Sequence, residues 1–375
     1  MTELVTRRVC LLGFGNVGRR LCELVARNDH ELAERHGLRL RFVAIGTAGH
    51  GSLLAPAGVS AAEALELGGG AEGARRAFPE PARLGVDLLA ASGADVLVEA
   101  TPLDPHGGRL AIAHLEAALE HGADAITVNK GPIAWDYRRL ADLAAAHGRR
   151  LLFEGAVMDG CPVFSLFRST LPDCRLLGFE AVFNSTTNFI LDAMGEGGSF
   201  AAALAQVQAA GYAEADPSHD IDGHDAAAKV AALANVLMDA GMTPDDVPKD
   251  SIRDVSPERV VAARRAGRRL RVVCTGRRGD GAGSAGGGVA GAGGSAADGG
   301  PAQPAAGSAS GRVSGAVRLT ELDADHPLFS AGGSTLSVLL HTDLMQTVQI
   351  AEIGALPEQT AYGIYSDLIA LHEGR

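Results

Sequence analysis

The sequence lacks the features that would place it in a membrane or among secreted, disulfide-linked proteins. No run of eighteen apolar residues occurs in its 375 residues, and the first apolar run is interrupted by glycines, unlike a signal peptide. The five cysteines are odd in number and scattered, without the Cys-X-X-Cys spacing of zinc or redox sites. We therefore expect a reduced, cytoplasmic protein.

Positive charge is also in deficit, since the formal net charge is −12. An acidic chain disfavours nucleic acid or an anionic membrane as partner. One basic cluster stands out, and no aromatic residues that could stack on bases are interleaved with it. It contains Arg264, Arg265, Arg268, Arg269 and Arg271. We interpret it as a solvated helix end that leads into a strand.

A glycine-rich turn follows the first apolar run, Val9 to Leu12, and leads into an amphipathic stretch. This order predicts strand, turn and helix, in which the glycines allow a tight turn and close approach of a pyrophosphate to the helix N-terminus. The turn, GFGNVG, would bind a dinucleotide through Gly13, Phe14, Gly15, Asn16, Val17 and Gly18.

The length and the 46% hydrophobic content allow a substantial core and two or three domains. Over 1–150, apolar runs alternate with helical stretches, which predicts a Rossmann-type, doubly wound and mostly parallel sheet. Segments after Cys174 predict a second sheet, so 151–344 should form an α+β catalytic, substrate and dimerisation domain. Within it, 276–314 is nearly all Gly, Ala, Ser and Pro, and we predict a disordered insert between two neighbouring strands.

A crowded segment, 211–229, combines acids, turn formers and a lysine ahead of an apolar helix. Asp225 and Lys229 lie four residues apart, which places them on one helix face near its N-terminus. Glu214 arrives from the preceding loop. On this spacing alone, a solvated ion pair at a helix start is the simpler interpretation.

Six motifs in order give the chain a resemblance to the homoserine dehydrogenase family, over nearly its whole length apart from the insert. They are GFGNVG at 13–18, ADVLVEATP at 94–102, TVNKGPIA at 127–134, EGAVMDGCPVF at 154–164, NSTTNFIL at 184–191, and GYAEADPSHDIDGHDAAAK at 211–229. The resemblance implies that the C-terminal segment, about 345–375, returns to the nucleotide-binding domain. It also implies a short form without a regulatory domain, which we expect to be insensitive to threonine.

The implied reaction is NAD(P)-dependent interconversion of homoserine and aspartate 4-semialdehyde, in the biosynthesis of threonine, methionine and isoleucine. Lys229 would handle the proton on the C4 oxygen, with Lys130 as its electrostatic partner and a cofactor contact. A desolvated ammonium near a second cation should have a lowered pKa. Asp225 and Glu214 match acids that receive the substrate ammonium.

Further contacts carried over from the family are Thr101 and Gly354, both near the nicotinamide. The strand Leu40 to Ile45 ends without an acid that could bind a ribose hydroxyl of NAD. Together with Thr47 and His50, this predicts a slight preference for NADP over NAD. The segment 154–164 resembles a loop that binds Na⁺ or K⁺, although a glycine-rich turn packed under the site is an equal alternative. Its ligands would be Glu154 and the backbone carbonyls near Val157, Asp159 and Cys161.

Several departures from the family pattern leave alternatives open. Pro357, Glu358 and Gln359 replace small residues before the last helix. The chain could therefore be a paralogue that acts on a related amino-acid alcohol in secondary metabolism. A second alternative makes Cys161 an acylating nucleophile, as in semialdehyde dehydrogenases, but no histidine lies in its local segment to act as a base. For the assembly we expect a homodimer.

Overall fold

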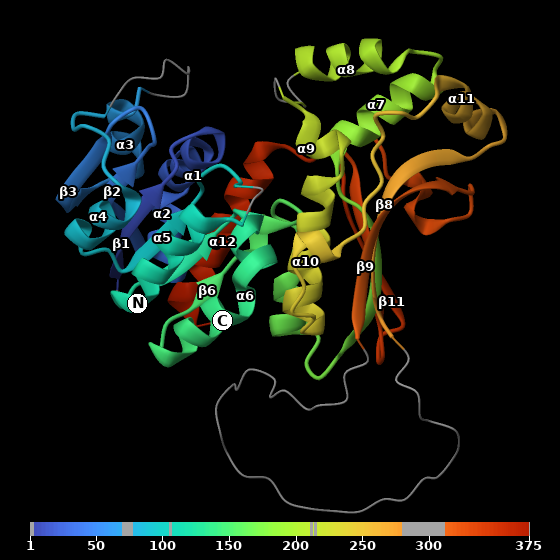
Figure 1. Cartoon of the computed structure of the whole chain (residues 1–375). Helices are drawn as coiled ribbons and strands as arrows, with labels where there is room; N and C mark the ends of the chain where they lie inside the picture. The colour runs from blue at the N-terminus through green and yellow to red at the C-terminus, as the bar shows by residue number, and fades with distance from the viewer. Residues whose placement is uncertain are drawn as a thin grey trace, which may run out of the picture.

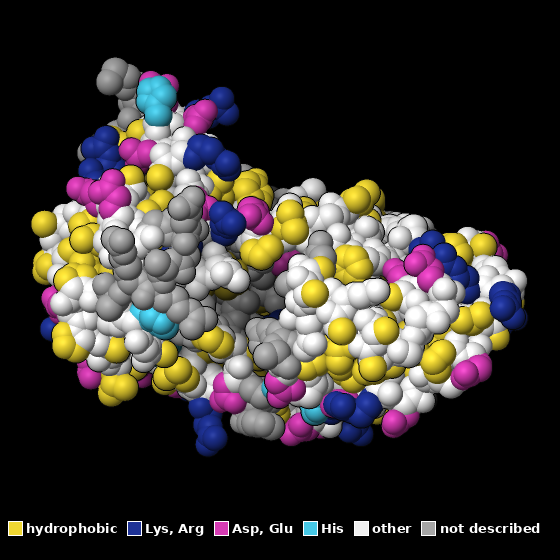
Figure 2. Space-filling view, turned by 90° about the horizontal axis from the view of Figure 1, so that it is seen from above, with side chains coloured by type: hydrophobic (Ala, Val, Ile, Leu, Met, Phe, Trp, Pro, Cys, Tyr) yellow, Lys and Arg dark blue, Asp and Glu magenta, His cyan; other side chains and the backbone are white. Residues whose placement is uncertain are grey.

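The computed structural model describes residues 4–69, 78–104, 107–210, 213, 216–279 and 312–374. It shows two sheets with their helices, one formed by the first part of the chain and one by the second (Figure 1). Predicted site residue Glu214 and most of the predicted insert lie outside the described residues. Among the helices that are described, none combines the length and apolar character needed to cross a bilayer. Acidic, basic and apolar side chains are intermixed on the face shown in Figure 2.

The first sheet has six strands in the order β3-β2-β1-β4-β5-β6, all parallel except β3, which pairs antiparallel with β2. This confirms the predicted doubly wound sheet. Its central strands are continuous apolar runs because both faces are covered by helices. The strands are β1 (Val5–Leu12), β2 (Leu38–Gly46), β3 (Ser52–Val59), β4 (Val96–Glu99), β5 (Asp124–Thr127) and β6 (Leu151–Leu152).

Alternate residues of β1 enter two different cores, one on each face of this sheet. Val9 and Leu11 join the core that also contains Ile364 and Leu368 of the last helix, whereas Cys10 and Leu12 join the other. The helices around this sheet are α1 (Asn16–Arg27), α2 (Asp29–His36), α3 (Ala61–Leu67), α4 (Gly85–Ser92), α5 (Arg109–Glu120), α6 (Lys130–Ala146) and α12 (Pro357–Glu373).

The second sheet is antiparallel, with strand order β11-β10-β7-β8-β9. Helix α10 packs on one of its faces (Figure 1). The strands are β7 (Leu176–Val182), β8 (Arg269–Arg278), β9 (Val313–Leu322), β10 (Leu336–Thr342) and β11 (Thr347–Glu352). The helices are α7 (Ser185–Gly195), α8 (Phe200–Ala209), α9 (Ser218–Ile221), α10 (His224–Met238) and α11 (Pro257–Arg265), with the short turns η1 (Glu154–Ala156), η2 (Leu166–Thr170), η3 (Pro244–Asp246) and η4 (Pro327–Ser330).

Three predicted boundaries are corrected by strand pairing. The insert was placed at 276–314, but Arg278 pairs with Val313, so both ends of that range belong to β8 and β9. The C-terminal segment was placed in the first domain from about 345, but β11 pairs with β10 of the second sheet. Conversely, β6 pairs with β5 and joins the first sheet, beyond the predicted boundary at 150.

The arginine cluster is a helix end that leads into a strand, as predicted, because α11 ends at Arg265 and β8 begins at Arg269. The prediction that the cluster is solvated is wrong at Arg271, which is buried with only 1% of its surface exposed. Its Nη2 lies 2.7 Å from Asp192 Oδ1, and its Nε donates to the Ala331 carbonyl. The residue can be buried because these partners neutralise its charge and accept its N–H groups.

Helices α6 and α10 are joined at their contact by one buried amide. Backbone angles at Asp136 are not helical, so α6 is kinked there. The side-chain N–H groups of Asn235 on α10 point to the carbonyls of Ile133 (3.3 Å) and Ala134 (3.2 Å) in α6. This amide therefore fixes the first turn of α6, which begins at Lys130, against α10.

Candidate active site

Three charged side chains meet where α6 and α10 begin. Lys130 Nζ lies 2.8 Å from Asp225 Oδ1, and Lys229 Nζ lies 3.4 Å from Asp225 Oδ2. All three are shielded from water, with side-chain exposures of 19%, 13% and 13% for Lys130, Asp225 and Lys229. The arrangement is not the solvated ion pair that spacing alone suggested, because a second lysine, distant in sequence, reaches the same carboxylate.

The start of α7 holds this triplet in place. Lys229 Nζ donates to the Phe183 carbonyl at 2.9 Å. Next to it, Asn184 caps α7 and donates from Nδ2 to both Asp225 Oδ2 (3.2 Å) and Asp220 Oδ1 (2.6 Å). Sequence reasoning assigned no role to Asn184 or Asp220, although both lie inside the motifs that carried the resemblance.

The electrostatics of the site differ from the prediction of a lysine with a lowered pKa. Burial by itself lowers the pKa of Lys229, but the carboxylates of Asp225 and Asp159 outweigh it, so that the pKa is raised above its ordinary value. Burial would likewise raise the pKa of Asp225, yet the two ammonium groups lower it instead. The correction follows from the geometry, because a carboxylate lies between the two cations.

The glycine-rich turn is shaped for close contact. Gly13 has φ +101°, and a Cβ there would lie 2.3 Å from the Ala100 carbonyl oxygen. A Cβ on Gly18 would lie 2.2 Å from the Gly13 oxygen, whereas one on Gly15 would meet nothing within 4 Å. Gly13 and Gly18 are thus needed for packing, and Gly15 leaves open space at the N-terminus of α1. No side chain caps that helix, so its first amides suit a phosphate.

Two predicted nicotinamide contacts lie in loops after strands. Thr101 follows β4 at the carboxyl edge of the first sheet, where open sheets bind ligands, and its carbonyl accepts from Asn129 Nδ2 at 3.2 Å, next to Lys130. Gly354 lies between β11 and α12 with φ +77°. A Cβ at Gly354 would meet no described atom within 4 Å.

The predicted cation loop runs through η1, and its acids are already engaged. The Glu154 carboxylate accepts from the amides of Phe164 (2.8 Å) and Ser165 (2.7 Å). Asp159 Oδ1 accepts from Thr360 Oγ1 at 2.6 Å. These carboxylate oxygens are thus held by donors of the protein itself. Within the described residues, no group of three His, Cys, Asp or Glu side chains is arranged to hold a metal.

Cys161 does not have the environment of a nucleophile. Burial, together with the neighbouring Glu352 carboxyl, raises the pKa of its thiol to about 12, and Sγ lies 3.7 Å from Glu352 Oε2. A thiolate is the reactive form, so this environment argues against the acylating alternative. Glu352 itself, which sequence reasoning missed, has a pKa raised to about 7 by burial and by Asp159.

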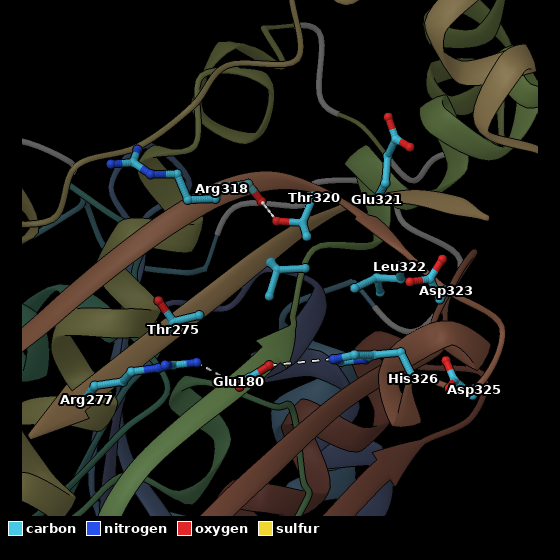
Figure 3. A pocket seen from close by; sticks show the side chains of 11 residues that line it. Glu180, Thr275, Arg277, Arg318, Thr320, Glu321, Leu322, Asp323, Asp325 and His326 are labelled. Carbon is cyan, nitrogen blue, oxygen red and sulfur yellow. Dashed lines mark hydrogen bonds and ion pairs between the residues drawn. The ribbon is translucent and has the colours of Figure 1, made fainter.

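A hollow of about 340 Å³ lies elsewhere, on the outer face of the second sheet (Figure 3). There Glu180 lies between Arg277 (3.0 Å) and His326 (3.7 Å). Val273 and Thr275 line the hollow, whereas the alternate residues Val272 and Cys274 belong to the core under α10. Because side chains alternate across a strand, the hollow and the lysines lie on opposite faces of the sheet.

The chain is similar to one protein family over most of its length. The model of the homoserine dehydrogenase family matches residues 162–369, and the model of its NAD-binding domain matches residues 13–154. The NAD(+)-dependent homoserine dehydrogenase of Pseudomonas canavaninivorans is 33% identical over 375 residues, covering 100% of this chain and 97% of the relative. The homoserine dehydrogenase of Methanocaldococcus jannaschii is 28% identical, with coverage of 97% and 98%.

A solved structure shows the same fold. A hyperthermophilic archaeal homoserine dehydrogenase in complex with NADPH superimposes with a TM-score of 0.74 and 24% identity, covering 99% of each chain. The dinucleotide turn lies within the match to the NAD-binding domain, and the segment with Asp225 and Lys229 lies within the match to the homoserine dehydrogenase model. The chain belongs to the homoserine dehydrogenase family and is an NAD(P)-dependent oxidoreductase.

Proposed function

We propose that this protein interconverts L-homoserine and L-aspartate 4-semialdehyde with a nicotinamide cofactor, through a site formed by the starts of α6 and α10. The observation that carries the proposal is the shared contact of Lys130 and Lys229 with Asp225, at 2.8 and 3.4 Å. A buried carboxylate between two ammonium groups suits proton transfer to a small polar substrate. Family membership identifies that substrate as homoserine.

In the oxidative direction, homoserine loses the hydride from C4, and a nicotinamide cofactor held by the turn at 13–18 would supply the hydride acceptor. The O–H proton passes to the neutral amine of Lys229, and the C4–O bond becomes a carbonyl. In the reverse direction the Lys229 ammonium returns this proton. Acids around Lys229 raise its pKa, so the ammonium form that aldehyde reduction needs predominates at neutral pH.

The other charged residues bind and align. Lys130 keeps Asp225 ionised and stabilises negative charge on the C4 oxygen as the proton moves. Asp225 holds both lysine ammonium groups in position. Together with Glu214 it also binds the substrate ammonium, whose charge must be neutralised when it leaves water. Thr101 and Gly354 contact the nicotinamide end of the cofactor, and the turn at 13–18 binds its pyrophosphate.

Cofactor choice is expected to favour NADP modestly over NAD. After β2, the Thr47 hydroxyl donates to the Gly51 carbonyl at 2.8 Å and accepts from the His50 amide at 2.9 Å. This compact loop offers no carboxylate that would repel a 2′-phosphate, and His50 can face it. Initial rates with both cofactors test the preference, and strong activity with NAD alone would refute it.

Two finer proposals concern the cation and the assembly. Na⁺ or K⁺ would be held by backbone carbonyls of 154–161, because the Glu154 carboxylate already accepts two main-chain N–H groups. Replacing Na⁺ or K⁺ in the assay by choline should then lower activity. A homodimer would form through the outer face of the second sheet, where side chains such as Arg277 and Arg318 are exposed. Light scattering during gel filtration tests it, and a monomer at micromolar concentration would contradict it.

Asp225→Ala tests the assigned site. Loss of the group that orients the amino acid should raise KM for homoserine and lower kcat/KM, while cofactor affinity stays near that of the wild type. A panel of amino-acid alcohols measured alongside separates homoserine from the paralogue alternative. If Asp225→Ala changes kcat and KM by less than about threefold, well under 1 kcal/mol, the assigned site is wrong.

A further inference from the structure

Glu99, the last residue of β4, is a fully buried carboxylate in the middle of the carboxyl edge of the first sheet. Its Oε1 accepts hydrogen bonds from the main-chain N–H (3.1 Å) and the hydroxyl of Thr101. Its Oε2 accepts from the Thr127 hydroxyl at the end of β5, at 3.0 Å. A buried carboxylate needs such donors. Two of them belong to Thr101 in the loop after β4, and the third belongs to Thr127, the last residue of β5. The buried ring of His114 on α5 also lies near, with Nδ1 3.8 Å from Glu99 Oε1.

These bonds close into a ring that reaches the start of α6, where Lys130 lies. Thr127 Oγ1 accepts from the Asn129 amide at 3.0 Å, and Asn129 Nδ2 returns to the Thr101 carbonyl at 3.2 Å. Asn129 also caps α6, where its Oδ1 accepts from the Gly131 amide at 3.0 Å. One carboxylate thus ties the loop of Thr101 to the helix start that carries Lys130.

The ring also fixes which way the Thr101 hydroxyl can bond. A carboxylate carries no proton and can only accept, so the single hydroxyl proton of Thr101 points toward Glu99 Oε1. The remaining lone pairs of Thr101 Oγ1 then face away from Glu99. Toward a ligand, Thr101 can accept a hydrogen bond but cannot donate one.

We propose that Glu99 is a positioning residue that makes Thr101 an acceptor for the amino group of the nicotinamide carboxamide and, through Thr127 and Asn129, holds Lys130 beside Asp225. This inference rests on the proposed function, because it needs the nicotinamide ring at this edge of the sheet. It assigns Glu99 no contact with substrate or cofactor. Its two effects run through different carboxylate oxygens and can be separated by mutation.

The test compares the natural cofactor with its analogue in which an acetyl group replaces the carboxamide, using homoserine as substrate. The acetyl group has no N–H to give to Thr101. In Glu99→Met both acceptors are lost and the Thr101 hydroxyl is free to turn and donate to the acetyl oxygen. We expect kcat to fall about tenfold or more, and the wild-type preference for the carboxamide cofactor in kcat/KM to shrink about three- to tenfold.

Two more variants separate the arms of the ring. Glu99→Gln keeps an oxygen that can accept from Thr101, so the preference for the carboxamide should return toward the wild-type value. Thr127→Val removes the hydroxyl that bonds to Glu99 Oε2 and to the Asn129 amide, and leaves both bonds from Thr101 to Glu99 Oε1 in place. It should lower kcat about three- to tenfold through Lys130 and leave the cofactor preference unchanged. If Glu99→Met does not fold, the kcat of Thr127→Val tests the inference instead, and an unchanged kcat would contradict it.

Asp124→Asn is the matched control. Asp124 is also a buried carboxylate of this sheet, but it lies at the opposite end of β5, where Oδ1 accepts from the Arg150 amide at 2.9 Å. We expect it to lower Tm and leave kcat and cofactor preference unchanged. The inference is overturned if the wild-type protein oxidises homoserine and both Glu99→Met and Thr127→Val keep the kcat and cofactor preference that Asp124→Asn keeps. Wild-type protein that fails to oxidise homoserine overturns the proposed function instead.

Discussion

Removing the amine of Lys229 should affect turnover far more than folding. In Lys229→Ala, Asp225 loses a partner at 3.4 Å but keeps Lys130 at 2.8 Å and the Asn184 amide at 3.2 Å. The carboxylate therefore stays paired, and we expect a loss of about 1–3 kcal/mol in the free energy of unfolding. Loss of a general acid or base costs about 10²- to 10⁴-fold in kcat, equivalent to about 3–5 kcal/mol.

The assay follows the absorbance of the reduced nicotinamide during homoserine oxidation over pH 7 to about 10. Wild-type kcat should rise across this range, because the raised pKa of Lys229 leaves only a minor neutral fraction at pH 7. The variant should lose this dependence, and added ethylamine should restore part of the rate, increasingly at higher pH. Lys249→Ala, a substitution of the same type outside the site, should behave like the wild type. Loss of less than about threefold in kcat, or a loss that ethylamine does not relieve, would refute the role of Lys229.

Three further predictions address other parts of the molecule. Asp159→Asn removes one carboxylate that raises the pKa of Lys229, so the rise of oxidation rate should move to lower pH; an unmoved profile would contradict the assigned electrostatics. Burial raises the pKa of Asp367 to about 7. Between about pH 4 and 7 the folded chain therefore keeps a proton on Asp367 that the unfolded chain releases, so the free energy of unfolding falls as pH rises. Asp367→Asn should therefore raise Tm at pH 8 and flatten its pH dependence in thermal melts, whereas an equal slope in both proteins would refute this. Deleting residues 282–310 should leave Tm and activity nearly unchanged. The ends of β8 and β9 are already joined without this segment, because the Gly279 amide donates to the Arg312 carbonyl at 3.0 Å. A large fall in Tm would show that the segment packs on the fold.

The local pattern of apolar and turn-forming residues was sufficient to predict the strands and helices of the fold. Apolar runs such as Val9 to Leu12 became strands of the first sheet, because a strand buried on both faces must be apolar throughout. Glycine and proline marked most ends. The boundaries that failed, at Gly276 to Arg278 and Val313 to Ser314, lie where strand pairing with a distant partner orders residues whose composition alone indicates a loop.

The site was predictable only where its parts are close in sequence. Asp225 and Lys229 could be placed on one helix face from their spacing. The contact of Lys130 with Asp225 depends on how α6 packs against α10. The raised pKa of Lys229 depends not only on Asp225 but also on Asp159, which is distant in sequence. Glu99 offered a local signal, an acid within an apolar strand, but its role depends on two loops that meet only in the folded sheet.

The two lysines that share Asp225 also make the site chemically addressable. The whole chain contains only three lysines, Lys130, Lys229 and Lys249. Amine-directed reagents therefore have few side chains to modify, and two of the three lie in the site, shielded and paired with a carboxylate. Protection of these two amines by bound cofactor and homoserine, with Lys249 as an internal reference, would turn one mass-spectrometric labelling experiment into a footprint of site occupancy.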